Sequence, residues 1–220
     1  MIVPTYNEKG NLEELSTRLF KACDDAHIQA ELIVVDDNSP DGTGQFAREL
    51  AKKHDVKVIG RAGKLGLSSA VIEGIGIAQG DILVVMDADL SHPPEKVPEL
   101  VTSIESGRAD FALGSRYVEG GTIESWPFHR RIISKVATML ARPVTKVKDP
   151  MSGFFALRRE TWRRAEPLDP IGYKIALELY VKGGCCRPAE VPIRFATRAA
   201  GESKFRPAEQ LRYLRHLARL

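Results

Sequence analysis

The feature that most constrains the fold is the alternation of short apolar runs with longer amphipathic stretches over residues 1–115. Short apolar runs are typical of buried strands, and the longer stretches carry apolar residues at helical spacing. Strands that alternate with helices form a mostly parallel, doubly wound sheet. We therefore predict an α/β fold with strands at residues 2–4, 32–36, 56–60, 82–87 and 111–114, and helices at 11–27, 43–54, 67–78 and 95–106. Because the first strand begins at Met1, we also expect either that residues are missing upstream or that the start is misplaced.

The apolar run that starts at residue 82 ends in two carboxylates one residue apart, Asp87 and Asp89, before Pro93 and Pro94 stop the strand. Open α/β sheets bind ligands at the carboxyl ends of their strands. Two carboxylates there suit Mg²⁺ or Mn²⁺, with the phosphates of a ligand filling other positions. The alternative is that one of these carboxylates only caps the following helix.

Other predicted strands also end in polar side chains. Tyr6 can stack on a flat ring and Glu8 can accept hydrogen bonds from a base or ribose, unless this segment is only a helix start capped by Asn7 or Asn11. Asp37 can hold a ribose hydroxyl, as the acidic residue of dinucleotide folds does. Arg116 suits a phosphate through its bidentate fork, and a surface salt bridge is its alternative.

Several familiar signatures are absent. The chain has no Gly-x-Gly-x-x-Gly after the first strand and no Walker A motif, which disfavours NAD enzymes and P-loop NTPases. The acidic stretch from Asp37 is no EF-hand, because its twelfth position is Arg48. Gly74 and Gly76 are better explained by close helix packing than by a ligand. His92 is interpreted as structural.

Composition and charge narrow the possible partners. A net charge of +3 is too small to indicate nucleic acid, and three cysteines without metal-ligand spacing argue against a disulfide framework. The charge is uneven, however: residues 126–148 hold six basic residues and no acidic one. Residues 131–142 and 210–220 each predict a helix with one basic and one apolar face. Such helices lie on anionic membrane surfaces or pack as surface helices on their own core.

The motifs, taken in order, resemble glycosyltransferase family 2, in the branch that makes dolichyl-phosphate mannose. The resemblance covers nearly the whole chain and rests on VPTYNE at 3–8, VDDNSPDG at 35–42, MDADLSHPP at 86–94, GSRY at 114–117, DPMSGFFA at 149–156, IGYK at 171–174, EVP at 190–192 and GESK at 201–204. It implies a GT-A fold in a single catalytic domain. Residues 1–115 would bind the nucleotide-sugar, residues 116–206 the acceptor, and residues 207–220 would form a basic amphipathic helix.

The resemblance also implies residue roles. Nucleotide-sugar binding is expected at Pro4, Tyr6, Glu8, Val35, Asp37, Asp87, Ala88, Asp89, Ser91, Arg116, Lys174, Arg198 and Lys204. The acceptor phosphate is expected at Arg116, Arg130 and Ser134, which together with Asp89 form the expected catalytic set. The expected metal ligands are Asp87, Asp89 and Ser91. Family members often carry Gln where this chain has Ser91, whose hydroxyl is a shorter ligand.

The activity implied is inverting transfer of mannose from GDP-mannose to dolichyl or another polyprenyl phosphate, with Mg²⁺ or Mn²⁺ neutralising the leaving diphosphate. The expected location is the cytoplasmic face of a membrane: the endoplasmic reticulum in a eukaryote or the plasma membrane in a prokaryote. Small membrane subunits, or a transmembrane segment beyond Leu220, are expected partners.

Alternatives remain open. The donor can be UDP-glucose, or the acceptor a polysaccharide or protein, although the Gln-x-x-Arg-Trp string of processive synthases is absent. A nucleotidyltransferase or a plain nucleotide-binding module also uses Asp pairs on doubly wound sheets.

Overall fold

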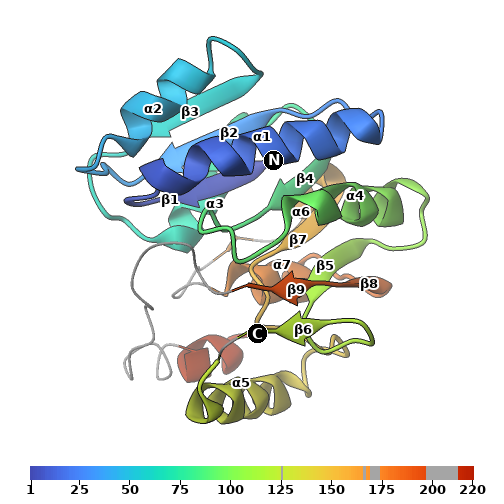
Figure 1. Ribbon diagram of the computed structural model, residues 1–220. Helices are drawn as coiled ribbons and strands as arrows, with labels where there is room; N and C mark the ends of the chain where they lie inside the picture. The colour runs from blue at the N-terminus through green and yellow to red at the C-terminus, as the bar shows by residue number, and fades with distance from the viewer. Residues whose placement is uncertain (125, 166, 169–173, 197–212) are drawn as a thin grey trace.

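A seven-stranded sheet forms the centre of the computed structural model, which describes residues 1–124, 126–165, 167–168, 174–196 and 213–220 (Figure 1). The strand order is β3-β2-β1-β4-β7-β5-β8. Every neighbouring pair is parallel except the two that involve β7, which runs antiparallel to β4 and β5. The strands are β1 (Ile2–Thr5), β2 (Leu32–Asp36), β3 (Val56–Gly60), β4 (Ile82–Val85), β5 (Phe111–Ser115), β7 (Phe155–Arg158) and β8 (Pro188–Pro192).

Helices cover both faces of this sheet. The apolar sides of α1 (Lys9–Asp25), α2 (Thr43–Leu50) and α4 (Val97–Glu105) pack on one face, against residues such as Val3 and Val34. On the other face, α3 (Leu67–Ile77) and α7 (Ile175–Lys182) pack against residues such as Ile2 and Ile33. Neighbouring strand residues thus point into opposite cores, as strand geometry requires. The predicted doubly wound, mostly parallel α/β fold is confirmed.

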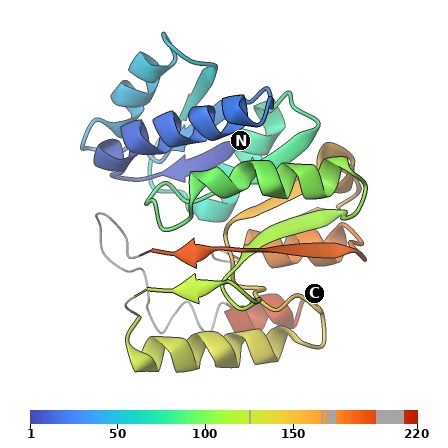
Figure 2. The ribbon, with the colours of Figure 1, turned by 45° about the vertical axis from the view of Figure 1, so that its right-hand side comes forward.

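A smaller layer lies beyond the sheet. A two-stranded parallel ribbon pairs β6 (Thr122–Ile123) with β9 (Arg194–Phe195), and α5 (Phe128–Ala141) lies beyond it (Figure 2). Ala137 and Ala141 of α5 pack with Leu177 of α7 and with Tyr213, whose hydroxyl donates to the Ala137 carbonyl at 2.7 Å. The segment containing Tyr213 therefore packs on α5 and is hydrogen-bonded to it. Of the predicted helix at 210–220, residues 210–212 lie outside the described part.

The element boundaries differ from the predicted ones where local chemistry intervenes. The predicted helix at 95–106 divides into a 3₁₀ turn (η1, Pro94–Lys96) and α4, because Pro94 begins η1 and Pro98 is the second residue of α4. The helix predicted to reach residue 54 ends at Leu50, beyond which Lys52 and Lys53 are exposed and have no core to pack on. The antiparallel strand β7 and the short helix α6 (Arg159–Arg164) were not predicted.

The two glycines of α3 differ in their surroundings. A Cβ on Gly74 would lie 2.5 Å from Cγ2 of Ile2 and 3.0 Å from Cγ2 of Val35, so the helix backbone approaches the sheet closely there. Gly76 has nothing within 4 Å of its Cβ position. Close packing therefore explains Gly74 but not Gly76. All three cysteines are free thiols, as predicted.

Candidate functional site

The carboxyl ends of the parallel strands lie along one edge of the sheet. Tyr6 follows β1, Asp37 follows β2, Asp87 follows β4 and Arg116 follows β5. Strand order reverses direction at β1, with β2 on one side and β4 on the other, and open α/β sheets form their ligand crevice at such a point. The topology thus places the polar residues that follow β1, β2, β4 and β5 at the edge where a ligand binds.

The carboxylates of Asp87 and Asp89 have different surroundings. Asp89 is 5% exposed, and its Oδ1 accepts the backbone N–H of Ser91 at 3.1 Å. Leu90 between them adopts φ +58°, a left-handed conformation that is costly for a branched side chain. Neither η1 nor α4 has a side-chain cap, so the capping alternative is wrong for the helices that follow.

Asp87 lies beside Gly153 and is partly exposed. Its side chain is about one-third exposed, and a Cβ on Gly153 would lie 3.4 Å from Asp87 Oδ2. The hydroxyl of Ser91 is buried and has no hydrogen-bond partner in the described part of the chain. Among the described residues, no group of three His, Cys, Asp or Glu side chains could hold a metal ion alone. This donor set fits a divalent cation that takes its remaining oxygens from a bound diphosphate and water.

His92 connects the carboxylate pair to Arg116. Its Nδ1 lies 3.9 Å from Asp87 Oδ2, and its ring packs against Phe154 and Phe195 at centroid distances of 5.4 and 5.2 Å. The Arg116 guanidinium lies 5.2 Å from the same Phe195 ring. Burial lowers the pKa of His92, although the negative charge of Asp87 opposes this. The packing supports a structural role for His92.

Asp37 is held by a residue that the sequence analysis missed. Arg61, the first residue after β3, donates from Nη1 to Asp37 Oδ1 at 2.6 Å, and the backbone N–H of Gly66 donates to Oδ2 at 3.1 Å. Both members of this ion pair are buried. Nη2 of Arg61 also donates to Ser69 at 2.6 Å. The position of Arg61 directly after a predicted strand was the available signal.

The loops after β1 and β2 are bonded to each other. The N–H of Asn7 donates to Ser39 Oγ at 3.0 Å, and the N–H of Glu8 donates to Thr43 Oγ1 at 3.0 Å. Glu8 accepts a hydrogen bond from Asn11 at 2.7 Å and occupies the N-cap of α1 without a side-chain cap, so the idea that Asn7 or Asn11 caps this helix is wrong.

The Tyr6 ring carries a cation on one face. Lys64 Nζ lies 3.9 Å from the ring centroid. Of the other residues expected near the nucleotide-sugar, Val35 and Ala88 are buried, and Pro4 is half-buried and lies opposite Val35 in the sheet. Because the Val35 side chain is wholly covered, any ligand contact there would be through its backbone.

Arg116 is locked by a carboxylate distant in sequence. Its Nε and Nη2 donate to Asp149 Oδ2 and Oδ1 at 2.7 and 2.6 Å, and its backbone N–H also donates to Oδ2 at 2.9 Å. Burial acts to lower the pKa of Arg116, but the hydrogen bonds and charge of Asp149 outweigh it and raise that pKa. The salt bridge of Arg116 is therefore buried and does not lie on the surface. Like Arg61, Asp149 had no predicted role in the site.

The three residues expected to hold the acceptor phosphate gather around two aromatic rings. The guanidinium groups of Arg116 and Arg130 lie 5.0 and 4.1 Å from the centroid of Trp126. Tyr117 donates its hydroxyl proton to Ser134 Oγ at 2.8 Å, and Arg116 lies 5.5 Å from the Tyr117 ring. Two cations and a hydroxyl, from the residue after β5 and from α5, thus lie close together.

The remaining predicted residues lie elsewhere or outside the described part. Lys174 precedes α7, and its Nζ donates to the Met151 carbonyl at 3.5 Å. Arg198 and Lys204 lie outside the described residues, as do residues 171–173 and the GESK motif at 201–204.

Comparisons with known proteins give the family. The model of Glycosyl transferase family 2 matches residues 1–164. The chain is 51% identical to the dolichol-phosphate mannosyltransferase of Pyrococcus furiosus over 100% of its own length and 62% of the relative's, so it spans under two-thirds of that protein. It is 44% identical to the enzyme of the same name from Saccharomyces cerevisiae, over 100% of this chain and 85% of the relative. It is 41% identical to the polyprenol monophosphomannose synthase of Mycolicibacterium smegmatis, over 93% and 79% of the two chains.

Solved structures confirm the predicted GT-A fold. The mannosyl-3-phosphoglycerate synthase of Rubrobacter xylanophilus superposes with a TM-score of 0.73 at 18% identity, over 99% of this chain and 72% of that one. The glucosyl-3-phosphoglycerate synthase of Mycobacterium tuberculosis, in complex with Mn²⁺, UDP and glucosyl-3-phosphoglycerate, gives a TM-score of 0.70 at 23% identity, over 99% of this chain and 76% of that one. At such identities the likeness concerns the fold alone.

Proposed function

The chain belongs to glycosyl transferase family 2, and from that premise we propose that it transfers mannose from GDP-mannose to the phosphate of dolichol or another polyprenol. The observation that carries the proposal is the link between two clusters: the carboxylates Asp87 and Asp89, and the cations Arg116 and Arg130. His92 and Phe195 connect Asp87 to Arg116, and Trp126, which contacts Phe195, carries Arg130. The relatives named for dolichol-phosphate or polyprenol mannose synthesis support the choice of sugar and acceptor.

The donor diphosphate would lie at Asp87 and Asp89. A divalent cation held there supplies Lewis-acid stabilisation of the leaving diphosphate. Asp89 is suited to this role because Ser91 fixes its carboxylate, and Asp87 because it is partly exposed beside Gly153. Ser91 Oγ is a third candidate, since it is buried without a partner in the described chain. Asp37, Tyr6 and Glu8 would bind the nucleoside.

The acceptor would enter from the α5 side. A polyprenyl monophosphate has a second pKa of about 6, so at neutral pH much of it is a dianion and needs no general base. Arg130 and Ser134, with the part of Arg116 that Asp149 leaves free, would bind its oxygens. In-line attack by a phosphate oxygen on the anomeric carbon would break the bond to the diphosphate and invert the configuration of the sugar.

The surface of α5 supports work at a membrane. Five of its apolar side chains are exposed: Phe128, Ile132, Val136, Met139 and Leu140. Basic residues flank them on the same helix, as in helices that lie on anionic bilayers. No helix among the described residues is long and apolar enough to cross a membrane. We place the protein at the cytoplasmic face of a membrane, with membrane subunits or a segment beyond Leu220 as candidate anchors.

One assay tests the proposal. Purified protein with Mg²⁺ or Mn²⁺, radiolabelled GDP-mannose and a short polyprenyl phosphate is expected to move label into the organic phase. The same mixture with UDP-glucose is the matched control for the donor. If only UDP-glucose serves as donor, the transferred sugar is glucose and the proposed donor is wrong. If neither donor is used while a known enzyme of the family is active in the same assay, the proposal is refuted.

A further inference from the structure

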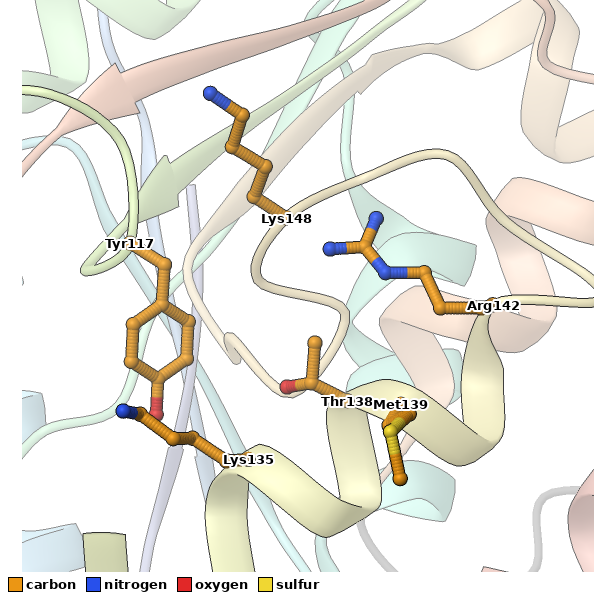
Figure 3. A pocket seen from close by; sticks show the side chains of 6 residues that line it. All are labelled: Tyr117, Lys135, Thr138, Met139, Arg142 and Lys148. Carbon is orange, nitrogen blue, oxygen red and sulfur yellow. The ribbon is translucent and has the colours of Figure 1, made fainter. Parts of the chain in front are cut away.

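An open pocket of about 400 Å³ lies on the flank of α5 (Figure 3). Four of its six lining residues come from α5 and the residue that ends it, one follows β5, and one precedes β7. They are Tyr117, Lys135, Thr138, Met139, Arg142 and Lys148. None of these belongs to the sites assigned above to the donor, the metal or the acceptor phosphate.

The lining carries three cations and no acid. Lys135 and Lys148 form no ion pair with the described residues, and Nη1 of Arg142 donates only to the carbonyls of Lys146 and Val147, at 3.3 and 3.4 Å. The neighbouring carboxylates are engaged elsewhere. Asp149 pairs with Arg116, and Glu190 accepts the backbone N–H groups of residues 148 and 149 at 2.8 and 3.1 Å. A pocket with this charge favours an anion.

Thr138 supplies a hydroxyl that the protein leaves unsatisfied. The residue is 9% exposed, and its Oγ1 has no hydrogen-bond partner in the described part of the chain. A buried hydroxyl without a partner is costly, and helical threonines usually bond to the preceding turn instead. Figure 3 shows its oxygen turned toward the side of the pocket where Tyr117 lies. An anionic oxygen in the pocket would satisfy this hydroxyl.

The pocket opens beside the apolar surface of α5. Met139, which is 67% exposed, lines the pocket and belongs to the exposed apolar set of that helix. A ligand with an anionic head and an apolar tail can therefore place the head among the cations and the tail over Met139. Tyr117 separates this pocket from the acceptor cluster, since its hydroxyl is bonded to Ser134 while its side chain lines the pocket.

We propose that this pocket binds the phosphate headgroup of an anionic membrane phospholipid that is not a substrate. The site depends on the proposed function only for the expectation that the protein works at a membrane. Bound there, the headgroup would fix the orientation of α5 beside the bilayer, so that the acceptor cluster behind Tyr117 faces the acceptor phosphate.

Vesicle binding tests the site without donor or acceptor, so failure of sugar transfer would not affect the result. The full chain is sedimented with phosphatidylcholine vesicles that contain or lack phosphatidylglycerol. Lys148→Gln is expected to weaken binding to the anionic vesicles about fivefold. Thr138→Val changes no charge and is expected to weaken this binding about tenfold or more, because one hydrogen bond to a charged group is lost. Neither variant should change binding to phosphatidylcholine alone.

The matched control is Lys52→Gln, which removes the same charge from an exposed turn after α2, at the far end of the molecule from α5 (Figure 1). If Lys52→Gln and Lys148→Gln weaken binding to anionic vesicles equally and Thr138→Val does not weaken it, the binding comes from diffuse surface charge and not from the pocket. That result would overturn the proposal. Two further outcomes would also overturn the proposal. In the first, inorganic phosphate raises the Tm of the unchanged protein but not that of Thr138→Val, while neither variant weakens binding to anionic vesicles; the pocket would then bind free phosphate and not a lipid. Alternatively, Lys148→Gln could raise the KM for a short polyprenyl phosphate in neutral detergent.

Discussion

At the scale of single residues, the two carboxylates after β4 are predicted to contribute unequally. Asp89 is buried and oriented by Ser91, whereas Asp87 is partly exposed. Asp89→Asn is expected to lower kcat more than about a hundredfold, since stabilising a leaving diphosphate is worth several kcal/mol. Radiolabel transfer measures this. Asp81→Asn, an exposed carboxylate just before the opposite end of β4, is the control, and near-normal turnover in Asp89→Asn would remove it from the mechanism.

A second residue-scale prediction concerns the buried pair Arg116–Asp149. Asp149→Asn leaves a buried guanidinium without its counter-charge, which is expected to cost about 3–5 kcal/mol of unfolding free energy. Glu124→Gln, which breaks the exposed pair with Arg194, is expected to cost less than about 1 kcal/mol. Urea denaturation measures both. Equal effects would mean that Asp149 acts through something other than the pair.

Which site residues the sequence could predict depends on the distance along the chain between partners. Asp87 and Asp89 stand one residue apart at the end of an apolar run, so a local pattern predicts them. Arg61 pairs with Asp37, which lies 24 residues away along the chain, and Asp149 pairs with Arg116, which lies 33 residues away. No local sequence pattern indicates partners so far apart. The predicted roles of Arg116, Arg130 and Ser134 stay predictions.

At the scale of elements, replacing either of two glycines of α3 by alanine is expected to have opposite effects on stability. Gly74→Ala would place a methyl group 2.5 Å from Ile2, and overpacking of this kind costs about 1–3 kcal/mol. Gly76→Ala meets nothing within 4 Å and is expected to stabilise the protein by up to about 1 kcal/mol through helix propensity. Thermal unfolding of the two variants compares them, and a stabilised Gly74→Ala would mean that α3 is free to move off the sheet.

Element prediction succeeded where strands and helices alternate locally. The predicted ranges for β2 and β3 match the observed ones, because each is an apolar run closed by turn residues. β7 was missed because its four residues form a strand by pairing with β4 and β5, which lie about 40 to 75 residues earlier in the chain. The antiparallel direction of β7 breaks the alternation on which the prediction rested.

At the scale of the whole molecule, the exposed apolar face of α5 predicts binding to a bilayer even without anionic lipid. Val136→Gln is expected to weaken binding to phosphatidylcholine vesicles about fivefold, because a side chain that is 45% exposed would no longer enter the apolar phase. Ile77→Gln, at 43% exposure on α3, makes the same chemical change away from α5 and is expected to leave binding unaltered. Equal binding by both variants would mean that α5 does not touch the bilayer.

The position of β7 has a consequence for synthesis on the ribosome. Strands β1 to β4 come from residues 2–85 and can pair as soon as that length has emerged, but β5 then has no neighbour, because the place beside β4 belongs to β7. Because synthesis proceeds from the N-terminus, residues 155–158 must emerge before β5 can join β4 through β7. Since α5 is made within that interval, the basic helix leaves the ribosome before the sheet behind it is complete.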